Sequence, residues 1–305
     1  MSEVRIGNAP VSYGVFGTTI VGASPTDLLA SIAAAGYEGS ELGPPGFFGT
    51  PEQTGAAFAA AGLATVGAYV PVHFALDDDT VAFDLERMAV TCRELAAAGG
   101  GLAILADEGS QALLHNPARP WDDRALALDG QQWEVLAERV GHAIDLAGRF
   151  GITCSFHPHI STYVESPWEA EKLLELTDVA LTLDIGHVRL AGGDPADFAA
   201  AWSERINHVH IKDVDLSVIQ AARAEKRTDF DVWWANVCTP LGAGDVDIEG
   251  FLGVLYRTGY DGWLVIEQDR QPTSLAEYPA VAAEQARNRR WLADRVAVAR
   301  NKVAG

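Results

Sequence analysis

The amino-acid sequence predicts an α/β protein with a single (β/α)₈ TIM barrel. Short runs rich in β-branched residues alternate eight times with longer Ala- and Leu-rich stretches. Strands that alternate with helices pair in parallel, and eight repeats favour closure of the sheet into a barrel. The chain has 305 residues, near the usual size of one such barrel, and 48% of them are hydrophobic. We therefore expect one domain over residues 1–305.

The predicted strands are short apolar runs, and the predicted helices begin at capping or proline signals. The strands are expected at 4–9, 39–42, 65–69, 101–105, 153–157, 180–184, 206–211 and 263–267. The helices are expected to begin near Pro25, Pro51, Thr80, Gly130, Pro167, Pro195, Asp247 and Ser274. Ser24 and Asp194 each place a capping side chain before a proline at the first helical position. No glycine-rich phosphate loop follows the first strand, which argues against a Rossmann fold.

Two long irregular stretches, 107–128 and 213–246, are expected as insertions between a strand and the next helix. Barrels build their active sites on that side. The second stretch contains Trp233 and Trp234. Two adjacent tryptophans are costly to leave in water, so we expect this stretch to cover the site or to contact a neighbouring subunit.

Composition limits the partners. The formal charge is −20, from 42 acidic against 22 basic residues, so the surface repels phosphate backbones and nucleic acid is not an expected partner. No apolar run approaches about 18 residues, and the first residues do not resemble a signal peptide, so no membrane association is expected. The three widely spaced cysteines suit reduced thiols in the cytoplasm. Homo-oligomerisation stays open.

Histidines and carboxylates gather at the ends of four successive strands. The segments are SFHPH at 155–159, LDIGH at 183–187, HVHIKD at 208–213 and VIEQD at 265–269. Carboxyl ends of barrel strands meet at one face, so these side chains are expected to converge. Imidazole nitrogens and carboxylate oxygens together suit Mn²⁺, Co²⁺, Fe²⁺ or Zn²⁺. The sequence therefore predicts one divalent metal ion.

The two-residue period of a strand orders the candidates within each segment. His208 and His210 face the same side, and His210 lies nearer the rim, so it is the better metal ligand. His157 and His159 also share a side. Pro158 ends the strand directly after His157, so we interpret His157 as a ligand and His159 as a substrate contact, with the reverse order as the alternative.

These motifs resemble the xylose isomerase-like TIM barrels and, within them, the inosose (2-keto-myo-inositol) dehydratases. The stretches that carry the resemblance are IGNAPVSYG at 6–14, ELG at 41–43, HPHIST at 157–162, LDIGH at 183–187, HVHIKDV at 208–214, TPLGAGDVD at 239–247 and GYDGWLVIEQD at 259–269. The HPH and HxKDV segments are the most specific to the dehydratases, whereas LDxGH and VIE belong to the superfamily at large.

The resemblance implies a set of metal ligands. Carried over by motif, they are His157, Asp184, His210 and Glu267, with Mn²⁺ or Co²⁺ favoured and Zn²⁺, Fe²⁺ or Mg²⁺ as alternatives. His157 departs from the glutamate that the wider family usually has on strand five, which makes the site less anionic. A Ser-Thr pair at 161–162 also replaces the expected Gly-Thr.

The resemblance also implies a cyclic polyol ketone as substrate and dehydration as the reaction. Loss of water next to a ketone needs one base and one acid. Glu41 and His187 are the candidates for proton transfer, and Lys212 for oxyanion stabilisation. The predicted substrate contacts are His159, Asp213 and Thr162, with Asp213 also orienting Lys212.

Alternatives remain for these residues and for the activity. Glu41 could cap a loop, Lys212 and Asp213 could form a plain ion pair at the rim, and His187 could hydrogen-bond a ligand carboxylate. A metal-dependent sugar or inosose isomerase or epimerase would begin with the same proton abstraction. A third possibility is a sugar-binding barrel without catalysis, which the full set of ligands argues against.

Overall fold

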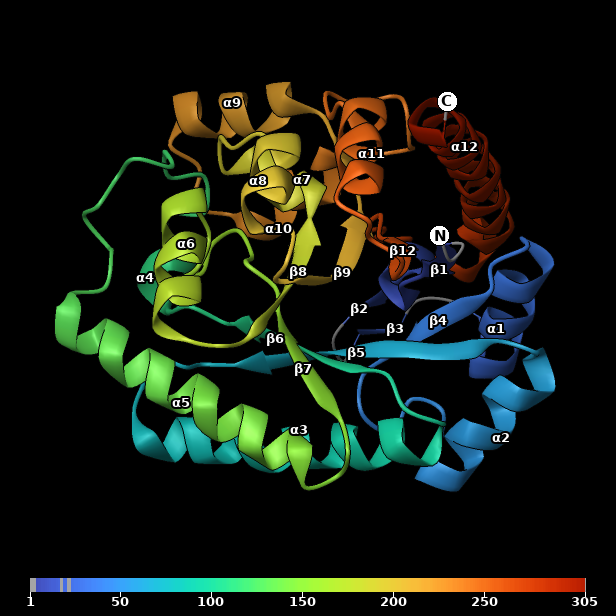
Figure 1. The fold of residues 1–305 in the computed structure, drawn as a ribbon, viewed down its shortest axis with the longest axis horizontal. Helices are drawn as coiled ribbons and strands as arrows, with labels where there is room; N and C mark the ends of the chain where they lie inside the picture. Colours follow the sequence, from blue (N-terminus) through green and yellow to red (C-terminus); the bar gives the residue numbers. More distant parts are fainter. Residues whose placement is uncertain (1–3, 17–18, 21–22, 305) are drawn as a thin grey trace.

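The computed structural model describes residues 4–16, 19–20 and 23–304. Eight parallel strands close into a barrel in the order β1-β12-β9-β8-β7-β6-β5-β4, which confirms the predicted fold class (Figure 1). The strands are β1 (Arg5–Asn8), β4 (Gly39–Leu42), β5 (Ala64–Val72), β6 (Leu102–Asp107), β7 (Thr153–Phe156), β8 (Ala180–Asp184), β9 (Ile206–Ile211) and β12 (Trp263–Ile266). All eight predicted strands are present, and those at β4, β8 and β9 have the predicted bounds.

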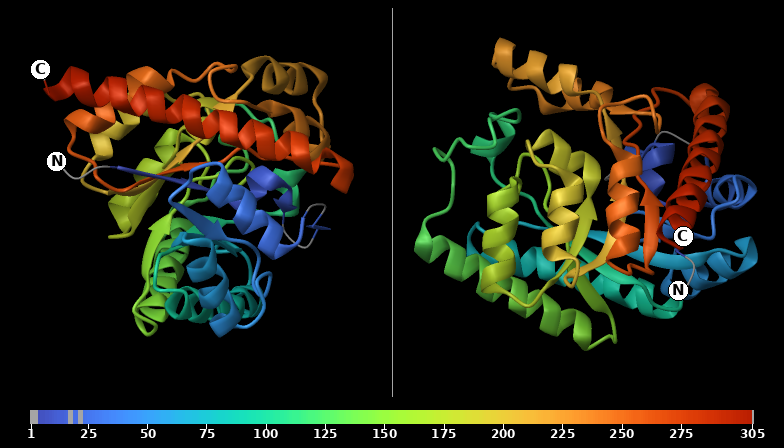
Figure 2. Two further views of the ribbon diagram at one scale, coloured as in Figure 1. Left: turned by 90° about the vertical axis from the view of Figure 1, so that its right-hand side faces the viewer. Right: turned by 45° about the horizontal axis from the view of Figure 1, so that its top comes forward.

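Helices surround the barrel, and α12 lies alongside α11 and α1 (Figure 2). The outer helices are α1 (Pro25–Ala34), α2 (Pro51–Ala61), α3 (Asp78–Ala97), α5 (Gly130–Gly148), α6 (Pro167–Leu176), α8 (Pro195–Trp202), α11 (Ile248–Arg257) and α12 (Tyr278–Ala304). The expected caps are formed. The Ser24 hydroxyl accepts a hydrogen bond from the Asp27 N–H, and the Asp194 carboxylate accepts from the first turn of α8.

Some boundaries differ from the prediction for local reasons. Helix α3 begins at Asp78 rather than near Thr80, because the Asp77 carboxylate is the cap and accepts from the Thr80 N–H. Helix α12 begins at Tyr278 rather than near Ser274, after a short 3-10 turn η2 (Leu275–Glu277). Strands β5 and β6 run beyond their predicted ends, and this extension carries them further toward the barrel mouth.

The two long insertions contain regular structure that the sequence did not predict. Residues 213–246 form β10 (Asp213–Val214), α9 (Leu216–Glu225), α10 (Phe230–Val237) and β11 (Cys238–Thr239), and β10 pairs antiparallel with β11. Residues 107–128 include α4 (Gln111–Leu114). Other unpredicted elements are η1 (Pro10–Tyr13), the pair β2 (Val15–Phe16) and β3 (Thr19–Ile20), and α7 (Ile185–Leu190).

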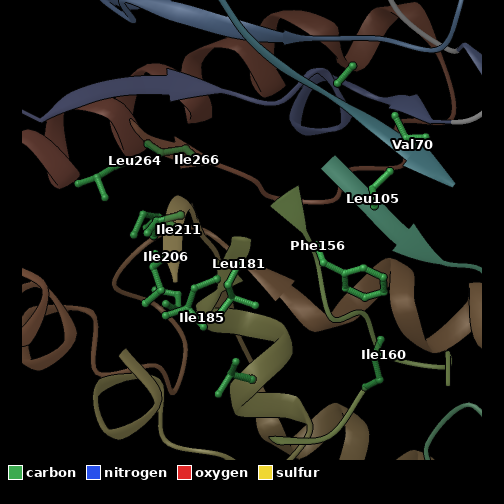
Figure 3. Close-up of a cluster of buried hydrophobic side chains, with 14 of the residues drawn as sticks. Val70, Leu105, Phe156, Ile160, Leu181, Ile185, Ile206, Ile211, Leu264 and Ile266 are labelled. Carbon is green, nitrogen blue, oxygen red and sulfur yellow. The ribbon is translucent and has the colours of Figure 1, made fainter. Parts of the chain in front are cut away.

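Apolar side chains fill the space between strands and helices and also close the lower barrel. Figure 3 shows part of the core that Val70, Leu105, Phe156, Leu181 and Ile266 build with their neighbours. A separate cluster inside the barrel includes Val66 and Trp263. Gly39 makes room for it, because a Cβ there would lie 2.7 Å from Val66 Cγ2 and 2.8 Å from the Trp263 ring. The polar residues therefore lie above a packed floor. Within residues 4–16, 19–20 and 23–304, no helix is long and apolar enough to cross a membrane.

Candidate functional site

Strand register brings the four predicted metal ligands together. Asp184 on β8 and Val265 on β12 both lie level with His210 on β9. The Asp184 Oδ2 atom is 3.7 Å from His157 Nε2 and 3.7 Å from His210 Nδ1. The Glu267 Oε2 atom lies against His210 Nδ1. The atoms that face one another are thus two nitrogens and two oxygens from four neighbouring strand ends.

These four atoms lack hydrogen-bond partners among the described residues. They are His157 Nε2, Asp184 Oδ2, His210 Nδ1 and Glu267 Oε2, and all are buried. Buried polar atoms are normally paired, since an unpaired one loses its interaction with water without compensation. A bound cation would satisfy all four at once. The donor set therefore fits a divalent metal ion.

Glu41 lies behind His210 rather than beside the space for a substrate. Its Oε1 atom is 2.8 Å from the Nε2 atoms of both His208 and His210. Burial raises the pKa of Glu41, but the charge of His210 and hydrogen bonds from both histidines outweigh burial and lower it to about 2. A carboxylate at Nε2 keeps the proton of neutral His210 on that atom and leaves the Nδ1 lone pair facing Asp184. These contacts suit Glu41 to positioning rather than to the proton transfer expected from the sequence.

Lys212 is fully buried among carboxylates. Its ammonium nitrogen is 3.3 Å from Asp184, 3.3 Å from Glu267 and 2.8 Å from Asp269. Burial lowers the pKa of Lys212, but these three carboxylates outweigh burial and raise it well above the usual value. Lys212 is therefore a fixed positive charge beside the candidate metal ligands.

Asp213 does not contact Lys212 in the way the sequence suggested. Its two carboxylate oxygens accept hydrogen bonds from the backbone N–H groups of Val214, Gly242, Gly244 and Val246. Both oxygens are occupied within the protein, so Asp213 organises the 239–247 turn. Neither the expected substrate contact nor the alternative rim ion pair with Lys212 matches these bonds.

The LDIGH segment forms the turn from β8 into α7. Asp184 Oδ1 caps α7 by accepting from the N–H groups of Gly186 and His187, which leaves Oδ2 for the site. A Cβ at Gly186 would lie 2.7 Å from Lys212 Cγ. Glycine is therefore needed because the lysine side chain passes directly over this turn.

His187 lies between Lys212 and the aromatic ring of Trp234. The two rings stack with centroids 5.3 Å apart and planes at 17°. The Ile160 N–H points at His187 Nδ1 over 3.3 Å, and Lys212 Nζ is 3.1 Å from Nε2. A neutral imidazole has one lone pair. Both neighbours are donors, so a given tautomer of His187 accepts a hydrogen bond from only one of them.

His159 stands at the open side of His187. Its Nδ1 atom is 2.8 Å from the Ile160 carbonyl oxygen, so Nδ1 donates and Nε2 keeps its lone pair. The ring centroids of His159 and His187 are 4.0 Å apart. Thr162 donates to the His159 carbonyl oxygen and accepts from the Val164 N–H, so its hydroxyl shapes this turn.

The turn after β7 is held by the preceding insertion. Ser161 has φ 66°, a left-handed conformation that glycine adopts more readily, which is where the sequence departs from the expected Gly-Thr. Its hydroxyl donates to the Pro117 carbonyl, and its N–H donates to Glu165. Arg119 pairs with Glu165 and Glu169 in the same buried cluster. The 107–128 insertion thus fixes the loop that carries His159.

Sequence reasoning did not select several residues at this site. Asp269 pairs with Lys212, Arg119 anchors the loop after β7, and Tyr69 and Glu108 face the mouth. Strand period could have found Tyr69, since it lies two residues after Gly67, whose missing side chain leaves room for Ile104 inside the barrel. No local signal marks Arg119, because its partners lie more than 40 residues away in the sequence.

Comparison with known proteins finds relatives in both sequence and fold. The chain is 26% identical over 276 residues to an inosose dehydratase of Lactiplantibacillus plantarum, which covers 89% of this chain and 90% of that protein. Among solved structures, L-ribulose 3-epimerase superposes with a TM-score of 0.73 at 17% identity, covering 99% of this chain and 97% of that one. A structure of IOLI protein with a bound zinc atom superposes with a TM-score of 0.71 at 13% identity, covering 96% and 98%.

The structural likenesses show the shared fold, while the sequence relative adds similarity over most of both chains. The family model for the xylose isomerase-like TIM barrel matches residues 29–295, which include all four candidate ligands and every barrel strand except β1. The chain belongs to the xylose isomerase-like TIM barrel family.

Proposed function

We propose that this enzyme is a metal-dependent dehydratase, a carbon–oxygen lyase, that acts on a cyclic polyol ketone such as 2-keto-myo-inositol. The observation that carries the proposal is the group of four buried ligand atoms that have no hydrogen-bond partner among the described residues and lie beside a charged lysine. The similarity to an inosose dehydratase over most of both chains supports the choice of substrate.

The ion would be held by His157, Asp184, His210 and Glu267. When bound, it supplies Lewis-acid polarisation of the ketone oxygen. Two imidazoles and two carboxylates suit Mn²⁺, Co²⁺, Zn²⁺ and Fe²⁺, and the structurally similar IOLI protein binds a zinc atom. The identity of the ion is therefore open to direct measurement.

Lys212, His159 and His187 would stabilise charge and transfer protons in the reaction. The Lys212 ammonium stabilises negative charge that develops on the ketone oxygen when the neighbouring carbon loses its proton. His159 can accept a proton at Nε2, because its Nδ1 atom is engaged with the Ile160 carbonyl. In its protonated form, His187 can donate a proton to the departing hydroxyl group, which leaves as water. The stacked indole of Trp234 keeps water from one face of His187.

The presence of His157 favours a lyase over an isomerase or epimerase. A carboxylate can bind a metal through one oxygen and move a proton with the other. An imidazole that binds through Nε2 has its second nitrogen on the far side of the ring, where it cannot reach the same substrate carbon. His157 is therefore a poor member of the pair of proton-transfer groups that epimerisation needs. The alternative activity stays testable through its product.

The decisive experiment is incubation of metal-loaded protein with 2-keto-myo-inositol. Loss of water should give a hydroxy-enone, the enol form of a 1,2-diketone, visible as a new ultraviolet absorbance and as loss of one water in the mass spectrum. An isomerase or epimerase would leave the mass unchanged. Asp184→Asn and Glu267→Gln should abolish turnover together with metal binding. Full activity after complete metal removal would disprove the proposal.

A further inference from the structure

We propose that Tyr69 and Glu108 form a second binding arm of the same mouth, which holds two neighbouring hydroxyl groups of a polyol. The inference rests on the proposed function only in taking a polyol as the ligand. It assigns a binding role to a wall of the barrel that carries none of the predicted site residues.

Both residues project from strand ends into the barrel mouth. Tyr69 lies on β5, where Gly67 and Tyr69 share the inward face. Glu108 directly follows β6 and continues the inward series Ile104 and Ala106. The Glu108 N–H donates to the Val72 carbonyl over 3.1 Å, so the end of β5 holds this residue in place.

Tyr69 is open to solvent despite its position inside the barrel. The residue is 38% exposed, whereas the next inward residues of β6 below the rim, Ile104 and Ala106, are fully buried. A tyrosine that faces inward and is still exposed must border the open mouth. The surface it offers is therefore available to a small molecule that enters there.

The two side chains make an ordered pair of acceptors. The Tyr69 hydroxyl donates to Glu108 Oε1 over 2.8 Å. This bond fixes the phenol proton and leaves the phenol oxygen lone pairs free. Within the described part of the chain, no hydrogen bond reaches the other oxygen of Glu108. Two adjacent acceptors in a fixed relation match two adjacent hydroxyl donors of a polyol.

The pair also lies at the right place relative to the metal ligands. The Tyr69 ring meets the rings of His157 and His159 edge-on, with centroids 6.3 Å and 6.4 Å away. In the closed barrel, β5 is four strands from β9 in either direction, so Tyr69 faces Lys212 across the mouth. A ring-shaped substrate whose ketone lies beside Lys212 would direct its remote hydroxyl groups toward Tyr69 and Glu108.

The test measures binding separately from turnover. Isothermal titration with myo-inositol, which has no ketone, is carried out on the metal-loaded wild type and on Tyr69→Phe, Glu108→Gln and the double variant. Each single change should weaken binding by about 2- to 13-fold, the factor that one hydrogen bond contributes. The double variant should lose less than the product of the two factors, because the groups are coupled. Metal content should stay unchanged.

Tyr163→Phe is the matched control, since this tyrosine in the loop after β7 donates to Ser110 instead. The affinity of the Tyr163→Phe variant for myo-inositol should equal that of the wild type. With 2-keto-myo-inositol, Tyr69→Phe and Glu108→Gln should raise KM more than they lower kcat.

The outcomes separate the two proposals. If the wild type binds myo-inositol but dehydrates no ketone, the proposed function fails, and the arm stands when the variants weaken binding. If the wild type dehydrates the ketone and the variants match Tyr163→Phe in binding and KM, the arm is disproved and the function stands. A wild type that binds no polyol overturns both.

Discussion

At the residue scale, the contacts of Glu41 with two histidines predict a role that can be separated from proton transfer. Glu41→Gln keeps the shape but replaces the charged acceptor of His208 and His210 with a neutral one. Weakening such a partner of a ligating histidine typically costs about 10–100-fold in metal affinity. We expect that loss in a metal titration, with kcat near wild type once metal saturates.

A proton-transfer role for Glu41 would give a different result. Loss of a general acid or base typically lowers kcat by about 10²–10⁴-fold even at saturating metal. Such a loss would restore the role expected from the sequence. Glu86→Gln is the control, because this glutamate is exposed on α3.

If His210 is a metal ligand as proposed, metal binding depends on pH. Without metal, burial lowers the pKa of His210, but Glu267 and Glu41 outweigh burial and raise it well above 6.5. The ion must therefore displace a proton at pH 7. Metal affinity should rise with pH, about tenfold per unit for one released proton, until pH passes the raised pKa.

The ion pairs of His210 with Glu267 and Glu41 also stabilise the metal-free fold. Because the pKa of His210 is raised, its contribution to stability is full below the unfolded value of 6.5 and is lost as pH rises through the folded value. Metal titration in two buffers of different ionisation enthalpy counts the released proton. The control is His142→Asn, which changes an exposed histidine. This variant should release the same number of protons on metal binding as the wild type. An identical heat in both buffers would contradict the prediction.

The residue contacts also show where sequence reasoning reached its limit. His157, Asp184, His210 and Glu267 could be proposed because strand ends of a barrel converge and because the motifs around them resemble those of a known family. The contacts of Glu41 could not, since its partner His208 is 167 positions away across the barrel. The two-residue alternation of a strand shows toward which face a side chain points, but it does not show which residue that side chain meets.

At the element scale, α10 brings Trp234 onto the site. Trp234→Ala should expose His187, whose pKa burial and Lys212 hold well below the usual value, so that pKa should rise toward 6.5. We expect lower kcat with about one equivalent of metal retained. Histidine resonances followed by NMR against pH report the shift.

Trp233 is the matched control, because it is equally buried in α10 but packs edge-on against Phe230 and Trp234. Trp233→Ala removes a similar volume and should leave the pKa of His187 depressed. Equal shifts in the two variants would mean that α10 acts only through general packing.

The elements themselves were predictable to different degrees. The helices at Pro25, Pro51, Pro167 and Pro195 begin as predicted, because a cap and a proline fix the first turn within a few residues. Helices α9 and α10 were missed inside a stretch rich in charge and aromatic residues. Some of their apolar side chains pack against residues distant in the sequence, such as Trp234 stacked on His187, which a local pattern does not reveal.

At the scale of the whole molecule, the net charge argues against a nucleic-acid substrate. The formal charge of this protein is −20, so its electrostatic field repels a DNA duplex. Salt weakens this repulsion beyond the screening length. The barrel architecture therefore does not imply a nucleic-acid substrate.

We expect metal-loaded protein neither to bind nor to cut duplex DNA that contains an abasic site. Non-specific DNA-binding proteins typically bind with Kd of about 10⁻⁴–10⁻⁶ M, through cations that neutralise phosphates. Repulsion should place this protein above that range at low salt, where attraction would be strongest. Fluorescence anisotropy of a labelled duplex tests binding, and a denaturing gel tests cleavage. Binding that weakens steeply as salt rises would show a basic surface strong enough to overcome the net charge, and cleavage that requires the metal would assign the same ligand set to phosphodiester chemistry.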